Sequence, residues 1–126
     1  MKRLPLLRGL AVMLVLIGAA AALNAFPTSA AAPAKGTAAP GKAVFVKNCV
    51  VCHKVDGSGG MKLTGNPTPN WNDPKTWADP KRTDAYLRDS ITTGKITSGK
   101  VAWGKSGQLK PADIENVIAY IKTFKK

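Results

Sequence analysis

Cysteine and histidine side chains gather in one short run of the sequence, which reads KNCVVCHKVDG. Cys49 and Cys52 are the two cysteines of the chain, and His53 is its one histidine. Donors of these types permit three kinds of chemistry: a reactive disulfide, a structural zinc site, or the covalent attachment of a haem. The choice among them depends on the spacing and on what the rest of the chain offers.

The spacing of Cys49, Cys52 and His53 favours the haem. A Cys-x-x-Cys redox disulfide is typical of a βαβ setting, and no segment of this chain alternates as a strand does. A structural zinc ion normally takes four protein ligands, whereas this run supplies three. Two thiols one helical turn apart can add to the two vinyl groups of a haem, and the next residue can donate to the iron. The run therefore predicts one covalently bound haem c, with His53 as the proximal iron ligand.

The first thirty residues have the composition of an export signal. Three basic residues precede a continuous apolar run from Leu10 to Leu23, and small residues surround Ala30. This pattern predicts a signal peptide over 1–30, cleaved after Ala30, and a periplasmic location; the alternative is an uncleaved membrane anchor. Residues 31–40, rich in Ala, Pro and Gly, are predicted to form a flexible tether. Residues 41–126 are then the folded domain.

The charge of the chain is strongly basic, at +12. Removal of Lys2, Arg3 and Arg8 with the leader leaves 16 basic and 7 acidic residues, a formal charge of +9. Such a charge speeds the encounter with acidic surfaces. The lysines are dispersed and not clustered with aromatic residues, so nucleic acid is not expected as a partner.

Apolar periodicity predicts helices and no sheet. The last segment begins with Pro111, which suits the first position of a helix, and its apolar residues recur at the spacing of one buried helical stripe. The stripe consists of Ile114, Val117, Ile118 and Ile121. A middle helix is expected to have Asp84 as its N-cap, to end at Gly94 and to bury three side chains: Tyr86, Leu87 and Ile91. A short first helix is expected from Lys42 to Asn48.

Three separated stretches resemble the class I c-type cytochromes, the small monohaem electron carriers of the bacterial periplasm. They are GKAVFVKNCVVCHKVDG (41–57), TDAYLRDSITTGK (83–95) and AWGKSGQLKPADIENVIAYIKTF (102–124). The resemblance implies a monomer with the all-α cytochrome c fold, in which three main helices and long Gly/Pro-rich loops surround one haem. It also implies that the first and last helices cross at an aromatic contact, for which Phe45 and Tyr120 are the corresponding pair.

The function implied by this resemblance is one-electron transfer between redox partners, which we expect to present acidic docking surfaces. Such a carrier is not an enzyme and needs no acid, base or nucleophile; the serines of the chain have no free base to activate them if His53 binds iron. The alternatives are a haem-based ligand-binding or sensor protein, or a haem subunit of a larger oxidoreductase, with an open or Lys-ligated distal site.

The distal iron ligand is where the chain departs from the family. The family places a methionine just before its last helix, and this chain has Lys100 and Val101 at the corresponding positions. Met61, eight residues after His53, is the one methionine outside the leader, and eight residues can extend up to about 26 Å. A lysine must lose its proton before it can bind a metal. Three options stay open: Met61, taken as the tentative ligand, Lys100, or an open position.

The resemblance also implies contacts around the haem. A backbone carbonyl near Pro67 is expected to accept a hydrogen bond from the far nitrogen of His53 and so fix the imidazole. Trp103 and Leu109 are expected to pack on the haem, and Trp71 and Trp77 either to shield it or to fill the small core.

Overall fold

The computed structural model describes residues 34–126, which are helical as predicted. The predicted signal peptide, its cleavage after Ala30 and the start of the predicted tether lie outside the described residues. The helices are α1 (Ala38–Asn48), α2 (Val50–His53), α3 (Pro74–Ala78), α4 (Asp84–Thr93), η1 (Ile96–Ser98), α5 (Pro111–Ile121) and η2 (Lys122–Phe124). This part of the chain has no strand, only an isolated bridge between Lys95 and Lys100. None of its helices is long and apolar enough to cross a membrane.

The last helix, α5, forms the centre of the core. Pro111 occupies its first turn, and the backbone N–H of Lys110 donates to the Asp113 carboxylate at 3.0 Å. All four residues of the predicted stripe are buried: Ile114, Val117, Ile118 and Ile121. The apolar period therefore predicted correctly which face of this helix turns inward.

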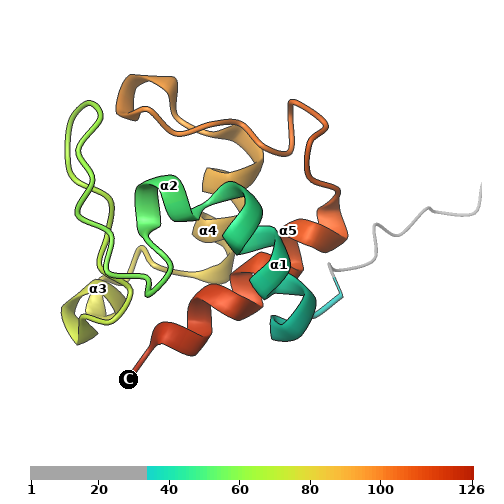
Figure 1. Ribbon diagram of the computed structural model, residues 1–126, viewed down its shortest axis with the longest axis horizontal. Helices are drawn as coiled ribbons and strands as arrows, with labels where there is room; N and C mark the ends of the chain where they lie inside the picture. The colour runs from blue at the N-terminus through green and yellow to red at the C-terminus, as the bar shows by residue number, and fades with distance from the viewer. Residues whose placement is uncertain (1–33) are drawn as a thin grey trace, which may run out of the picture.

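α1 lies across α5 (Figure 1), and the two helices touch through a glycine and an aromatic pair. A Cβ atom on Gly41 would lie 1.9 Å from the Asn116 carbonyl oxygen, so the two backbones are in direct contact. The rings of Phe45 and Tyr120 meet edge to face next to this point, with centroids 5.3 Å apart and an angle of 60°. Such pairs contribute beyond their buried area, and the predicted aromatic contact at the crossing is confirmed.

α1 begins at Ala38 and not at Lys42, so the predicted tether over 31–40 is three residues too long. Pro40 falls in the first turn of the helix. The N–H groups of a first turn have no acceptor within the helix, so a proline there removes no helical hydrogen bond. The predicted boundary treated Pro40 as a breaker, when its position in the first turn makes it compatible with the helix.

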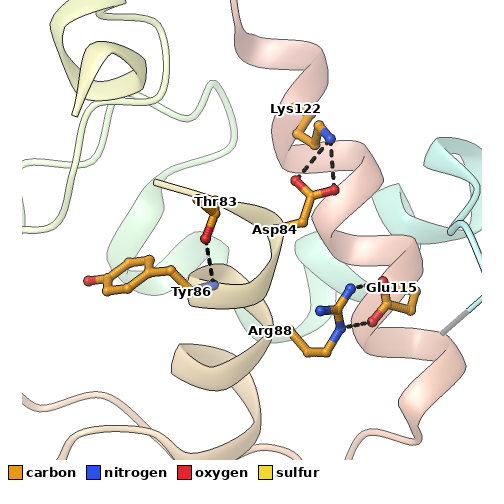
Figure 2. A network of polar contacts seen from close by, with 6 residues as sticks. All are labelled: Thr83, Asp84, Tyr86, Arg88, Glu115 and Lys122. Atoms are coloured by element: carbon orange, nitrogen blue, oxygen red, sulfur yellow. Dashed lines mark hydrogen bonds and ion pairs between the residues drawn. The ribbon is translucent and has the colours of Figure 1, made fainter. Parts of the chain in front are cut away.

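α4 differs from the prediction in its cap and in one side chain. Thr83, and not Asp84, is the N-cap, and its hydroxyl accepts a hydrogen bond from the backbone N–H of Tyr86 at 3.1 Å. Leu87 is buried and Ile91 is partly buried, but Tyr86 is 36% exposed. The predicted burial of Tyr86 in the core is therefore wrong, because its side chain leaves the opposite side of α4 from α5 (Figure 2).

Two ion pairs link α4 to the C-terminal helices (Figure 2), one to α5 and one to η2. Arg88 makes a two-pronged contact with Glu115, in which Nη2 lies 2.9 Å from Oε2 and Nε also donates to Oε1. This hydrogen bonding raises the pKa of Arg88 above its ordinary value. Lys122 and Asp84 also pair at 2.9 Å, but both side chains are about half exposed, so this pair is expected to contribute little. The Arg88–Glu115 pair fixes the orientation of α4.

Candidate functional site

The predicted attachment residues lie where α1 gives way to α2. The backbone N–H of Cys49 donates to the Phe45 carbonyl at 2.8 Å and closes the last turn of α1. The N–H groups of Cys52 and His53 then donate to the Cys49 carbonyl at 3.2 and 2.9 Å. The two cysteines are thus one helical turn apart, and both are partly buried free thiols. This is the spacing that attachment to two vinyl groups requires.

A cavity of about 340 Å³ lies beside this turn, within the range of roughly 300–1,000 Å³ typical of cofactor sites. All the predicted site residues line it: Cys49, Cys52, His53, Met61, Pro67, Lys100 and Trp103. α1, α4 and α5 supply its apolar walls through Phe45, Leu87, Ile91 and Ile121. The helices therefore offer apolar surface to a flat group, and the α2 turn and the loops offer the donor atoms.

His53 is held as a neutral imidazole. Burial, followed by the charge of Lys100, lowers the pKa of His53 from 6.5 to about 4. A neutral imidazole keeps the nitrogen lone pair that binds a metal. Its ring stacks against Trp71, with centroids 5.9 Å apart and an interplanar angle of 28°. His53 is therefore fixed on one wall of the cavity in the protonation state that an iron ligand needs.

The hydrogen bond predicted for the far nitrogen of His53 is not formed. Nδ1 is buried and has no partner among the described residues, although Pro67 does line the cavity. The adjacent carbonyl of Thr68 already accepts a hydrogen bond from the N–H of Gly60 at 2.9 Å. Among residues 34–126, the predicted hydrogen bond from His53 to a carbonyl near Pro67 is not present.

The cysteine thiols do not have the properties of a redox pair or of a zinc site. Burial and then the neighbouring Cys52 raise the pKa of Cys49 to about 11, whereas reactive cysteines have a lowered pKa. In residues 34–126, no three His, Cys, Asp or Glu side chains are placed to hold a metal ion together. Both alternatives to haem attachment therefore lose their support.

Two buried donors on the cavity wall supply an independent test of the haem. Trp71 Nε1 and Arg82 Nε are buried and have no hydrogen-bond partner within residues 34–126. The Arg82 guanidinium carbon lies 5.6 Å from the centre of the Trp71 ring, and its Nε is 3.9 Å from an Asp79 oxygen, too far for a hydrogen bond. Buried donors without acceptors are costly. A haem carries two carboxylates, which can accept hydrogen bonds from such donors. The cavity residues therefore fit a haem here as well as at the turn that carries Cys49, Cys52 and His53.

Nothing in the sequence around Arg82 marks it as a site residue, because a single arginine among many cations has no distinguishing spacing. Trp71 lines the cavity, as the prediction allowed, but Trp77 and Leu109 do not. Trp77 instead supports Trp71 from behind, with ring centroids 5.4 Å apart and a 2.7 Å hydrogen bond from its Nε1 to the Trp71 carbonyl. Leu109 is 7% exposed and belongs to the helical core.

Two loops meet at the rim of the cavity. The Thr64 hydroxyl donates to the Thr97 carbonyl at 2.9 Å, and both groups are exposed. The Leu63 side chain lies against Gly99, where an added Cβ would be 2.9 Å from it and where φ is 71°. Glycine is therefore required at position 99 both by its left-handed backbone and by this contact. These rim loops are residues 62–66, which follow α2, and residues 95–99, which follow α4.

Comparison with known proteins agrees with this geometry. The family model described as cytochrome c matches residues 38–125. The matched range contains the Cys-x-x-Cys-His run, the cavity walls and both rim loops. No curated protein and no solved structure matches the chain.

Proposed function

The chain belongs to the cytochrome c family and carries covalently bound haem c, and from this premise we propose that it is a periplasmic carrier shuttling single electrons between redox proteins. The observation that carries the proposal is the turn of α2, which places two thiols and one neutral, partly buried imidazole on the same cavity. In this proposal Cys49 and Cys52 form the thioether bonds and His53 is the proximal ligand. The haem supplies the exchange between Fe(II) and Fe(III).

The side chains around the cavity suit a carrier better than a catalyst. Phe45, Leu87, Ile91 and Ile121 keep water from one side of the cavity, and Trp71 holds the imidazole in place. Peroxide chemistry needs a distal acid or base. Among residues 34–126, no carboxylate lines the cavity, and its one imidazole, His53, is the proposed iron ligand; the other titratable side chains of the lining, besides the cysteines, are Arg82, Tyr86, Lys95 and Lys100. The side chains of the cavity can bind the haem, hold the imidazole in place and exclude water, and electron transfer requires no other chemistry from them.

Exposed lysines near the cavity support an acidic partner. Lys47 precedes the first cysteine, Lys54 follows the histidine, and Lys62 and Lys95 lie on the two rim loops; all four are exposed. Opposite charge on a partner would raise the rate of encounter, and salt would lower it. The proposed docking face is thus the rim of the cavity, where an electron has the shortest path to the haem.

Expression of the full chain with haem-attachment machinery tests the proposal. We expect a coloured protein in the periplasmic fraction whose mass equals residues 31–126 plus one haem, and a reversible one-electron redox titration. The rate of its oxidation by anionic ferricyanide should fall as salt is added, because a positive surface attracts the oxidant. A colourless product contradicts the proposal. A high-spin spectrum that shifts on addition of carbon monoxide supports the ligand-binding alternative instead.

The role of Arg82 is testable in the same titration. We expect Arg82→Leu to lower the reduction potential, because a nearby cation favours the less positive Fe(II) state. We also expect the potential to vary more with pH, since a carboxylate that loses its cationic partner has a raised pKa. Arg82→Lys keeps the charge and serves as the control. Equal potentials for all three proteins would show that Arg82 does not face the haem carboxylates.

A further inference from the structure

The second axial position of the iron is the part of the site that the proposed function leaves unassigned. Beyond the cysteines and His53, the cavity is lined by one thioether, Met61, and two amines, Lys95 and Lys100, that can donate a lone pair to iron; Lys95 is exposed, whereas Lys100 is partly buried. We propose that Lys100 is the distal ligand, that its amine binds the iron opposite His53, and that Tyr86 positions it. This inference rests on the proposed function, because it presupposes a haem attached to Cys49 and Cys52.

A short chain of hydrogen bonds links the Met61 backbone to the α2 turn that carries His53. The N–H of Gly59 donates to the His53 carbonyl at 3.1 Å, and the Thr68 hydroxyl donates to the Cys52 carbonyl at 2.7 Å. Thr68 in turn bonds the backbone of Met61 twice, through its N–H at 2.9 Å and its hydroxyl oxygen at 3.0 Å. The two axial ligands of a haem lie on opposite faces of its plane. A residue linked through Thr68 to Cys52, the residue before the proximal ligand, is badly placed for the other face.

Lys100 is carried by a different element. It lies on the segment that follows α4, and two backbone hydrogen bonds with Lys95, both 3.0 Å long, fix its backbone. The turn between them, η1, is closed by Gly99 in the left-handed region. Lys100 is partly buried and lines the cavity, whereas Lys105, further along the same segment, is exposed. Lys95 also lines the cavity but is exposed, so Lys100 is the partly buried lysine that this segment holds at the cavity.

The surroundings of Lys100 leave its nitrogen available to a metal. No ion pair within residues 34–126 includes Lys100; the pairs found there involve Arg82, Arg88 and Lys122. Its Nζ lies 5.8 Å from the centre of the Tyr86 ring, and Tyr86 also lines the cavity from α4. A lysine without a carboxylate partner loses less on giving up its proton than a lysine in a salt bridge. The exposed ring of Tyr86 is thus explained as a support for the Lys100 side chain.

Ligation by Lys100 is a simple exchange. The ammonium releases one proton to water, and the freed lone pair of Nζ forms the bond to iron. No electron is transferred and no other bond breaks. The lysine stem is flexible but long enough to fill apolar space on its way to the iron.

Four single variants of the full, haem-loaded protein test this assignment. We expect the oxidised unsubstituted protein to be low-spin and to lack the weak red band of a methionine–iron bond. Lys100→Ala and Lys100→Arg should both lose the low-spin spectrum, and added imidazole should restore it. Arginine keeps the charge but cannot give up its proton, so its failure separates ligation from electrostatics. Met61→Leu and the control Lys105→Ala should keep the original spectrum.

Other outcomes overturn the inference. If Met61→Leu loses the low-spin spectrum while Lys100→Ala keeps it, the ligand is Met61. If both keep it, neither residue binds the iron. The mass of each variant, with one haem attached, shows that the cofactor is in place; a coloured protein with an unchanged Lys100→Ala spectrum therefore defeats this inference alone, whereas a colourless unsubstituted protein defeats the proposed function.

Discussion

The Cys49→Ser, Cys52→Ser double variant is expected to release its haem on denaturation, whereas the unsubstituted protein keeps it covalently attached. We also expect the variant to unfold at a lower denaturant concentration than the unsubstituted protein, because it has lost the covalent link to its cofactor. Eight buried apolar side chains form the core of the described residues, and a core of this size supplies only about 5 kcal/mol without a cofactor. Mass spectrometry in denaturant reports the attachment, and far-ultraviolet circular dichroism reports the fold.

The single variants Cys49→Ser and Cys52→Ser are the matched controls. Each retains one thioether bond, so each should keep the haem mass in denaturant while losing some stability. A double variant that still carried haem in denaturant would show that the cofactor is attached elsewhere. In that case the reading of the α2 turn as the attachment site fails.

Gly41→Ala is expected to lower the free energy of unfolding of the holoprotein by about 3 kcal/mol. A methyl group there would lie 1.9 Å from the Asn116 carbonyl oxygen and 3.0 Å from the Cβ of Tyr120. Helix α1 must then move away from α5, which also separates Phe45 from its partner ring. Denaturant unfolding, followed by circular dichroism, measures the change.

The sign of this effect is diagnostic. Alanine is favoured over glycine inside a helix by up to about 1 kcal/mol, so without the close contact Gly41→Ala would stabilise the protein. The exposed position Ala43 in the same helix gives the reference: Ala43→Gly should cost no more than the propensity difference. A stabilised Gly41→Ala protein would mean that the α1–α5 crossing is looser than the structure shows.

Apolar periodicity and helix-start signals predicted the helices best where no nearby feature competed with them. The stripe of α5 has a strict period and a proline at its start, so both its burial and its first residue were predictable. Tyr86 shows the limit of the rule. Its position on α4 is compatible with burial in the helical core, but its side chain leaves α4 on the side away from α5 and lines the cavity instead. α3 is short, and Asp73 followed by Pro74 is its one local signal; the Asp73 side chain does accept a hydrogen bond from the N–H of Lys75.

The attachment residues were predictable because covalent chemistry fixes their spacing along the chain. The donors that reach the cavity from distant segments were not. Arg82 and Trp71 come together only after the chain has turned through α3. A periodic pattern in the sequence cannot predict a contact of this kind. The relation of Met61 and Lys100 is of the same kind. Both were candidates in the sequence, and they are separated by tertiary contacts: Met61 is linked through Thr68 to the Cys52 carbonyl, whereas Lys100 follows α4.

The weak contact between the rim loops affects how the cofactor can enter the folded chain. One exposed hydrogen bond and one side-chain contact join them, while backbone contact locks α1 to α5. Segments with so few buried contacts open locally, at a free-energy cost far below that of global unfolding. Amide protons in 62–66 and 96–99 would then exchange with solvent long before those of the two crossed helices. A planar cofactor can thus enter edgewise between parted loops, into a helical frame that is already assembled.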